Sequence, residues 1–261
     1  MGGPRRYKLI LEYDGTRYSG WQKQDDARTI QGSLLTAAAE IFDADTDIQG
    51  NGRTDAGVHA LRYTAHIETR TSMRPDEIRL RLNDLLPHDI AVLAVEPCHP
   101  KFHARHNCIA RSYHYRISRR KTAFAKKYVW WVRDHLDVSA MADAARLFEG
   151  MHDFVSFAEK QELKKSTRVL INAALLEQEE DMIFLRIVGS HFLWKMIRRM
   201  AGVLVEVGRH NLNADNIRDL LNRPSNTPAR YTAPPSGLFF EQAFYDKGEL
   251  QEYLSEISSK P

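Results

Sequence analysis

The spacing of apolar residues changes repeatedly along this chain, and this change restricts the fold more than any other feature. Polar and apolar residues alternate, as is typical of strands, over residues 5–13, 61–69, 90–97 and 110–118. Apolar residues three and four apart, which build one face of a helix, occur over residues 29–42, 74–86, 139–149 and 192–208. Strands and helices in this order predict an α+β fold. No apolar run reaches the roughly 18 residues of a membrane-spanning helix, so we expect none.

The second half of the chain resembles the first in its order of elements, although no sequence identity between them is evident. Two strand patterns flank an acidic turn at residues 179–181, and Asn213 is a suitable N-terminal cap for a short helix. A loop-rich stretch, residues 223–237, precedes a last strand and a terminal helix. We therefore expect two similar lobes, residues 1–105 and 106–261. Each lobe would have an antiparallel sheet flanked by helices, with a central cleft between them as the place for a site.

The net charge limits which partners the protein can have, and the N-terminal segment indicates its location in the cell. The formal net charge of +3 over 261 residues permits an RNA partner without requiring one. The first residues enter a strand pattern directly, without the apolar segment of a signal peptide, which predicts a cytoplasmic protein.

The segment CHPKFHARHNC, residues 98–108, contains residue types that often bind zinc. It carries Cys98, His99, His103, His106 and Cys108. Their spacing fits no standard zinc finger or ribbon, and alternation along extended chain would point them to different faces. We therefore predict no metal site, and reduced thiols rather than a disulfide.

The stretch GNGRTDAGVHA, residues 50–60, carries the most information about chemistry. Its glycines permit unusual backbone conformations, and between them stand Arg53 and Asp55. The glycine spacing matches neither a phosphate-binding loop nor a dinucleotide fingerprint. A guanidinium beside the carboxylate would keep it ionised, and an ionised carboxylate in a dry cleft serves as a nucleophile or a base. Spacing alone nevertheless favours a plainer interpretation, a hairpin turn stapled by an Arg–Asp pair.

The segment FLWKMIRRMAGVLVEVG, residues 192–208, predicts a long amphipathic helix. Lys195, Arg198 and Arg199 stand at i, i+3 and i+4, which places them on one helix face. Phe192, Met196, Met200 and Leu204 form a separate apolar stripe that we expect in the core. A cationic face can bind phosphates, although a solvated surface is the more usual role of such a face.

GRTDAGVHA resembles the signature loop of the TruA-type tRNA pseudouridine synthases. Four further blocks resemble that family in the same order, and together they run from about residue 7 to residue 245. They are LEYDGTRYSGWQKQDDARTIQGSL, FHARHNCIARSYHYRI, FLWKMIRRMAGVLVEVG and APPSGLFFEQAFY. Within them, Trp194 and Lys195 occupy a place where relatives vary, which bears on the choice of uridine rather than on the reaction.

The resemblance implies a pseudouridine synthase fold, a homodimer and no cofactor. It implies the anticodon arm of tRNA as the substrate, with uridines at positions 38 to 40 as targets. Asp55 matches the catalytic aspartate, Arg53 the loop arginine and Arg198 the basic residue that pairs with the aspartate. Tyr113 matches the tyrosine that packs on the target base, and Leu238 an apolar residue of the base pocket. We expect further contacts with the RNA backbone from Lys195, Arg199, Arg105 and Arg111.

Two other functions remain open from the sequence. One is an RNA-binding module that has kept the fold and lost catalysis, which the presence of both Asp55 and Tyr113 argues against. The other is a nucleoside hydrolase with a single carboxylate, which the basic helix face and the length of the resemblance argue against. Hydrolytic glycosidases usually need two carboxylates, whereas an isomerisation that neither adds nor removes atoms can use one.

Overall fold

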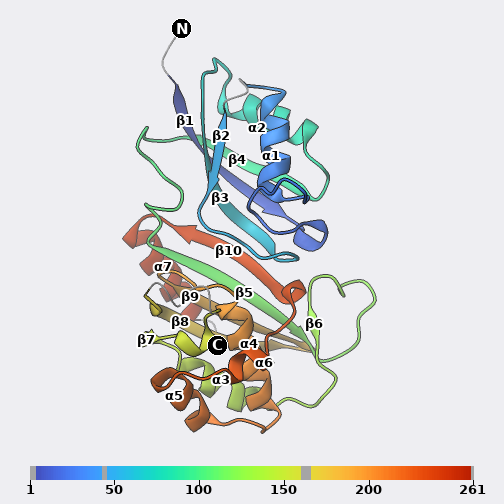
Figure 1. Ribbon diagram of the computed structural model, residues 1–261, viewed down its shortest axis with the longest axis vertical. Helices are drawn as coiled ribbons and strands as arrows, with labels where there is room; N and C mark the ends of the chain where they lie inside the picture. The colour runs from blue at the N-terminus through green and yellow to red at the C-terminus, as the bar shows by residue number, and fades with distance from the viewer. Residues whose placement is uncertain (1–3, 43–45, 160–165, 260–261) are drawn as a thin grey trace. The chain divides into compact units, whose positions relative to one another are not determined.

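The computed structural model describes residues 4–42, 46–159 and 166–259 (Figure 1). The chain forms two compact units. The first comprises Met1–Cys108 and Phe239–Tyr245, and the second comprises Ile109–Leu238 and Asp246–Pro261. The expected α+β class is confirmed, because strands and helices alternate in both units. The predicted division between residues 105 and 106 differs from these units in one respect. It placed the last strand in the second lobe, whereas Phe239–Tyr245 belong to the first unit.

The first unit is a mixed sheet with two helices on one face (Figure 1). Its elements are β1 (Arg5–Tyr13), α1 (Ile30–Ala39), β2 (Asp47–Gly50), β3 (His59–Thr69), α2 (Pro75–Leu85), β4 (Ile90–Pro97) and β10 (Leu238–Phe244). The strands β4, β1 and β3 are antiparallel neighbours. Along its other edge, β3 pairs with two strands in succession. Its first residues pair in parallel with β10, and its last residues pair antiparallel with β2.

Local sequence explains the two helices of this unit. Thr29 caps α1 by accepting a hydrogen bond from the Gly32 N–H, and the buried face of α1 includes Ile30 and Leu34. Pro75 begins α2, where its missing N–H costs nothing, and Ile78 is buried beneath the helix. These apolar faces cover the sheet, whose inward residues form the core of the unit.

The second unit is also a sheet, with helices on both faces. Its strands are β5 (Ala110–Ser118), β6 (Trp130–Trp131), β7 (Gly150–Asp153), β8 (Arg168–Glu179) and β9 (Met182–Gly189). Its helices are α3 (Val138–Arg146), α4 (Met196–Gly208), α5 (Ala214–Asn222), α6 (Thr227–Arg230) and α7 (Lys247–Ser258). The strands β5, β9, β8 and β7 are antiparallel neighbours, and β6 pairs in parallel with β5.

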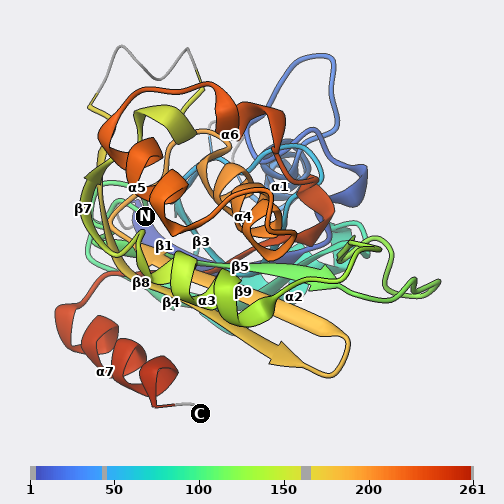
Figure 2. The ribbon, with the colours of Figure 1, turned by 90° about the horizontal axis from the view of Figure 1, so that it is seen from below.

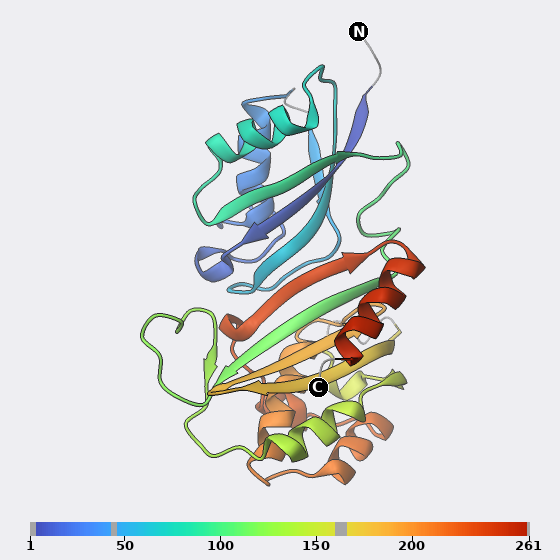
Figure 3. The ribbon, with the colours of Figure 1, turned by 180° about the vertical axis from the view of Figure 1, so that it is seen from behind.

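The helices of the second unit divide between the two faces of its sheet. Figure 2 shows α3, α4, α5 and α6 on one side of the strands and α7 on the other. Figure 3, from behind, shows α7 in front of β8 and β9. Within this arrangement α4 is surrounded, since α3 and α6 both contact it. Of the helices in the described ranges, none is long and apolar enough to cross a membrane.

Three details of the predicted elements were wrong. The sheets are not purely antiparallel, because β10 runs parallel to β3 and β6 parallel to β5. The helix expected over residues 192–208 begins only at Met196, since Lys195 before it adopts a left-handed conformation with φ of 61°. The loop-rich stretch 223–237 contains a short helix, α6. The predicted cap of α5 is confirmed, because Asn213 and Asn216 form a reciprocal capping box.

Candidate functional site

The loop with Asp55 connects two paired strands. Residues 51–58 join β2 to β3, so the expected hairpin is confirmed. At its base the Asn51 N–H donates to the Thr64 carbonyl at 3.0 Å. Beneath it lies a cluster of aromatic side chains, in which the rings of Trp21 and Tyr63 are 4.2 Å apart. The loop therefore rests on a packed support.

The backbone of the loop is held by the segment that follows β1. The Trp21 N–H donates to the Thr54 carbonyl at 3.2 Å, and the Gly57 N–H donates to the Tyr18 carbonyl at 3.3 Å. The hydroxyls of Tyr13 and Thr54 are 2.9 Å apart and hydrogen-bonded. These bonds lie on both sides of Asp55, whose own side chain is half-buried. The loop can therefore present a carboxylate from a backbone that does not need to rearrange.

Arg53 is exposed and lines a depression beside this loop, of about 300 Å³, in the first unit. Arg105 lines the same depression, so the structure brings to one place two cations that are 52 positions apart in the sequence. The other lining residues are polar for the most part: Trp21, Gln22, Gln31, Asp47, Gln49, Gly50, Gly52, His103 and His106.

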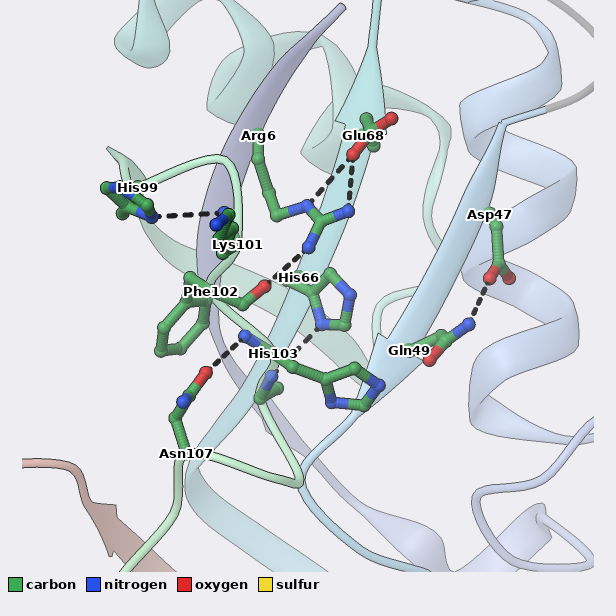
Figure 4. Close-up of polar contacts among 11 residues, drawn as sticks. Arg6, Asp47, Gln49, His66, Glu68, His99, Lys101, Phe102, His103 and Asn107 are labelled. Atoms are coloured by element: carbon green, nitrogen blue, oxygen red, sulfur yellow. Dashed lines mark hydrogen bonds and ion pairs between the residues drawn. The ribbon is translucent and has the colours of Figure 1, made fainter.

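The segment that carries Arg105, residues 98–108, is fixed by hydrogen bonds to the sheet (Figure 4). Arg6 forms an ion pair with Glu68 and also donates to the Phe102 carbonyl at 2.8 Å. His66 Nδ1 accepts a hydrogen bond from the Ala104 N–H at 3.2 Å. In the described part of the chain no group of three or more His, Cys, Asp or Glu residues is arranged to hold a metal ion. Cys98 and Cys108 are not bonded to each other.

His66 makes the stability of the first unit depend on pH. Burial, followed by the nearby His103 and Arg6, lowers the pKa of His66 from 6.5 to about 4. Between these two values the unfolded chain binds a proton that the folded chain does not, so folding is weakened as the pH falls through this window. We expect His66 to lower the free energy of unfolding by about 1–3 kcal/mol between pH 7 and pH 4.

The measurement is urea unfolding at a series of pH values for the natural chain and for His66→Asn. Asparagine retains an acceptor for the Ala104 N–H but does not titrate. The variant should therefore lose less stability on acidification than the natural chain does. Parallel pH profiles for the two proteins would remove His66 as the cause.

Tyr113 lies on β5 in the second unit, where it is 9% exposed. Its ring meets that of Phe192 edge to face, with centroids 5.1 Å apart. Arg111, two residues earlier on the same strand, donates to the Ser190 carbonyl at 2.9 Å. Because side chains two apart on a strand share a face, Arg111, Tyr113 and Tyr115 all project from one side of the sheet.

Arg198 lies over this same side. Burial raises the pKa of Tyr115, and the charge of Arg198 acts in the opposite direction, which requires the two groups to be near each other. The guanidinium of Arg198 donates through Nε to the Ala233 carbonyl at 2.7 Å, while its own carbonyl accepts the Ala233 N–H at 3.0 Å. Leu238, 6% exposed, follows on this segment at the start of β10. The structure therefore gathers Arg198 and the segment that leads to Leu238 around the face of β5.

The expected common face of Lys195, Arg198 and Arg199 is wrong for Arg198, which bonds to the Ala233 carbonyl, whereas Lys195 and Arg199 meet at Glu159. Arg199 is only 5% exposed, with its guanidinium 2.9 Å from Glu159 and bonded to the Ala158 carbonyl. Lys195 lies before the helix and pairs with the same Glu159 at 2.8 Å. The pKa of Glu159 is lowered, chiefly by its hydrogen bond from Lys195. Sequence spacing could not separate Arg198 from the other two, because the partners of these side chains, Glu159 and Ala233, are distant in the chain.

The sequence predicted no role for the side chains that hold the Asp55 loop. Tyr13, Tyr18 and Thr54 look like ordinary strand or loop residues, and their role depends on contacts across the unit. Their only signal in the sequence is that they stand, like Trp21, in the blocks LEYDGTRYSGWQKQDDARTIQGSL and GRTDAGVHA quoted above.

Comparison with known proteins finds relatives that match most of this chain. A family model described as tRNA pseudouridine synthase matches residues 9–107 and 144–246. A protein of Clostridium tetani named tRNA pseudouridine synthase A 2 is 36% identical over 247 residues, which cover 93% of this chain and 99% of that protein. A second protein of that organism, tRNA pseudouridine synthase A 1, is 38% identical over 92% of this chain and 100% of its own length. The tRNA pseudouridine synthase A of Afipia carboxidovorans is 37% identical over 92% of this chain and 99% of its own.

Proposed function

Because this chain belongs to the tRNA pseudouridine synthase family, we propose that it isomerises uridine to pseudouridine in tRNA with Asp55 as the catalytic group. We place the targets at positions 38 to 40 of the anticodon arm. The reaction breaks the C–N bond between uracil and ribose, turns the base, and forms a C–C bond to the same sugar carbon. No atom enters or leaves, so one ionised carboxylate acting on the nucleoside is sufficient chemistry.

The observation that carries this proposal is the way the Asp55 loop is held. Hydrogen bonds to the backbone on both sides of Asp55 fix its position, yet the side chain remains half-buried rather than enclosed. A residue that only stapled a turn would not need a backbone locked by a second segment. A carboxylate that must meet one sugar carbon does, because a misplacement of 1 Å can reduce a rate about 100-fold.

The uridine must leave its stack to reach such a loop, which costs a few kcal/mol. We assign Tyr113 to stacking on the base, which is worth about 1–3 kcal/mol per base. Leu238 would supply apolar contact for the uracil ring. Both side chains belong to the second unit, on the side of β5 where Arg198 lies. The pairing of Arg198 with Asp55 and a central cleft between two lobes stay predictions.

The cations divide into two groups. Arg53 and Arg105 are exposed and are suited to RNA phosphates, with Arg111 as a further candidate. We assign Arg199 and Lys195 to holding Glu159 rather than to direct phosphate contact. Phosphate contacts of this kind should make tRNA affinity fall steeply as salt rises.

The test is incubation of the chain with unmodified tRNA transcripts, followed by chemical labelling that maps pseudouridine. We expect pseudouridine at one or more of positions 38 to 40 and no release of free uracil. Free uracil as the product would indicate a hydrolase. Binding of tRNA without either product would indicate an RNA-binding module that has lost catalysis.

Two properties of the protein in the cell complete the proposal. We propose a homodimer, which sedimentation velocity would test by a mass twice that of the 30.0 kDa chain. We also propose a cytoplasmic location, where its tRNA substrate is found, and a reaction that needs no cofactor.

A further inference from the structure

The depression beside the Asp55 loop has walls from three separated segments of the first unit. Arg53 comes from the loop itself, Gln22 from the segment after β1, and Arg105 from the segment after β4. Its volume of about 300 Å³ is at the lower end of the range for small-molecule sites, a size suited to one nucleotide rather than to a cofactor of several rings.

The charge of the walls favours an anion. Two guanidiniums that line one depression can both donate charge-assisted hydrogen bonds to an oxygen-rich anion. Among the described residues that line the depression, Asp47 is the only carboxylate, and its side chain accepts a hydrogen bond from Gln49 Nε2 at 2.5 Å. The planar fork of arginine suits a phosphate group, which two such side chains can hold from two directions.

The uncharged side chains of the depression include amides that are held in place by hydrogen bonds. Gln31 is buried and accepts hydrogen bonds from Gln22 Nε2 at 2.6 Å and from the Lys23 N–H at 2.9 Å. Its own amide donates to the Ile48 carbonyl at 2.7 Å. The Gln22 amide is therefore held in one orientation. A nucleobase edge offers the donors and acceptors that such an amide can recognise.

The wall that carries Arg105 is fixed before any ligand arrives. Figure 4 shows the Phe102 carbonyl bonded to Arg6 and the His103 N–H bonded to Asn107, both beside His66. The rings of His103 and His106 lie close together, with centroids 4.1 Å apart and their planes tilted by 53°. Burial, and then the neighbouring His106, lower the pKa of His103, so the His103 ring is uncharged at neutral pH. Binding to such a preformed site loses little free energy to ordering.

We propose that this depression binds the nucleotide next to the target uridine in the tRNA strand. Its phosphate lies between Arg53 and Arg105, and its base meets the amides of Gln22 and Gln49 beside the His106 ring. Arg53 and Asp55 are two residues apart, at most about 7 Å along the backbone, so a phosphate on Arg53 belongs to the immediate neighbourhood of the reacting sugar. This inference rests on the proposed tRNA substrate.

The test compares Arg105→Gln with Lys101→Gln. Both residues are exposed on the same segment and both changes remove one positive charge, but Lys101 does not line the depression. With an unmodified tRNA transcript, we expect Arg105→Gln to raise KM about 10-fold and to reduce the slope of log affinity against log salt by about 1. Lys101→Gln should change KM by less than about twofold.

A modified RNA gives the second arm of the test. A transcript with an uncharged methylphosphonate in place of the phosphate beside the target should bind the natural chain about 10-fold more weakly. The same transcript should bind the Arg105→Gln variant only slightly more weakly than the unmodified transcript does. In that variant the phosphate has already lost the guanidinium that it would contact, so removing the phosphate charge removes no further interaction. Equal losses in both proteins, or equal effects of the two glutamine variants, would overturn the subsite. If the natural chain formed no pseudouridine in any tRNA, the proposed function would fall instead.

Discussion

Replacing Asp55 by asparagine should reduce the single-turnover rate of pseudouridine formation by at least about 1000-fold. Asparagine has almost the same size and cannot ionise, so the change removes the negative charge while it keeps the shape of the side chain. The bonds that hold the loop come from the backbone of residues 54, 55 and 57 and from the hydroxyl of Thr54. The variant should therefore fold, with a melting temperature within about 2 °C of that of the natural chain.

The matched control is Asp26→Asn, which makes the same chemical change at an exposed position of the same unit. It should leave the rate within about twofold. Binding of tRNA should survive in Asp55→Asn, because losing a negative charge near RNA phosphates does not weaken their attraction to the protein. An Asp55→Asn protein that retained more than a tenth of the natural rate would remove Asp55 from the mechanism.

Replacing Gly20 by alanine should damage both stability and catalysis. Gly20 has φ of +90°, which costs a residue with a side chain about 1–2 kcal/mol. An added Cβ would also lie 2.4 Å from the carbonyl oxygen of Thr54, a backbone atom of the catalytic loop that cannot rotate away. We expect a loss of about 3–5 kcal/mol in the free energy of unfolding. We also expect kcat to fall about 100-fold, because the loop must shift.

Gly150→Ala separates the two causes of this loss. Gly150 has a similar backbone conformation, with φ of +100°, but the nearest atom to its added Cβ is a side-chain nitrogen at 3.5 Å. It should cost only the conformational strain of about 1–2 kcal/mol and leave kcat unchanged. The two variants can be compared by urea unfolding and by single-turnover assays on one transcript. Equal stability losses, with kcat unaffected in both, would show that the Gly20 contact does not position Asp55.

The elements that the sequence predicted well are those whose partners are close along the chain. The period of apolar residues located α2 and the pair β8 and β9, and the acidic turn between these strands holds Glu180 with φ of 50°. The capping box at Asn213 is likewise a contact over three residues. Hydrogen bonds and apolar faces of this kind depend on the local sequence, so pattern alone can identify them.

The short strand β2 was not predicted because nothing local marks it. β2 has only four residues, too few for a period, and it is a strand because Asp47 to Gly50 pair with the far end of β3. The parallel pairing of β10 with β3 joins Phe239 to His59 across most of the chain. Such pairings follow from packing, which no window of sequence contains.

For the candidate site, the sequence by itself determined the chemistry, and the tertiary structure decided the positions. The string GRTDAGVHA identified Asp55 and Arg53, since residue types and their order carry the resemblance to the family. Only the structure showed that Arg199 is buried against Glu159, and that Arg53 and Arg105 line one depression. The physical reason is that burial and side-chain proximity depend on long-range packing, and the free energy of that packing is shared among residues far apart in the chain.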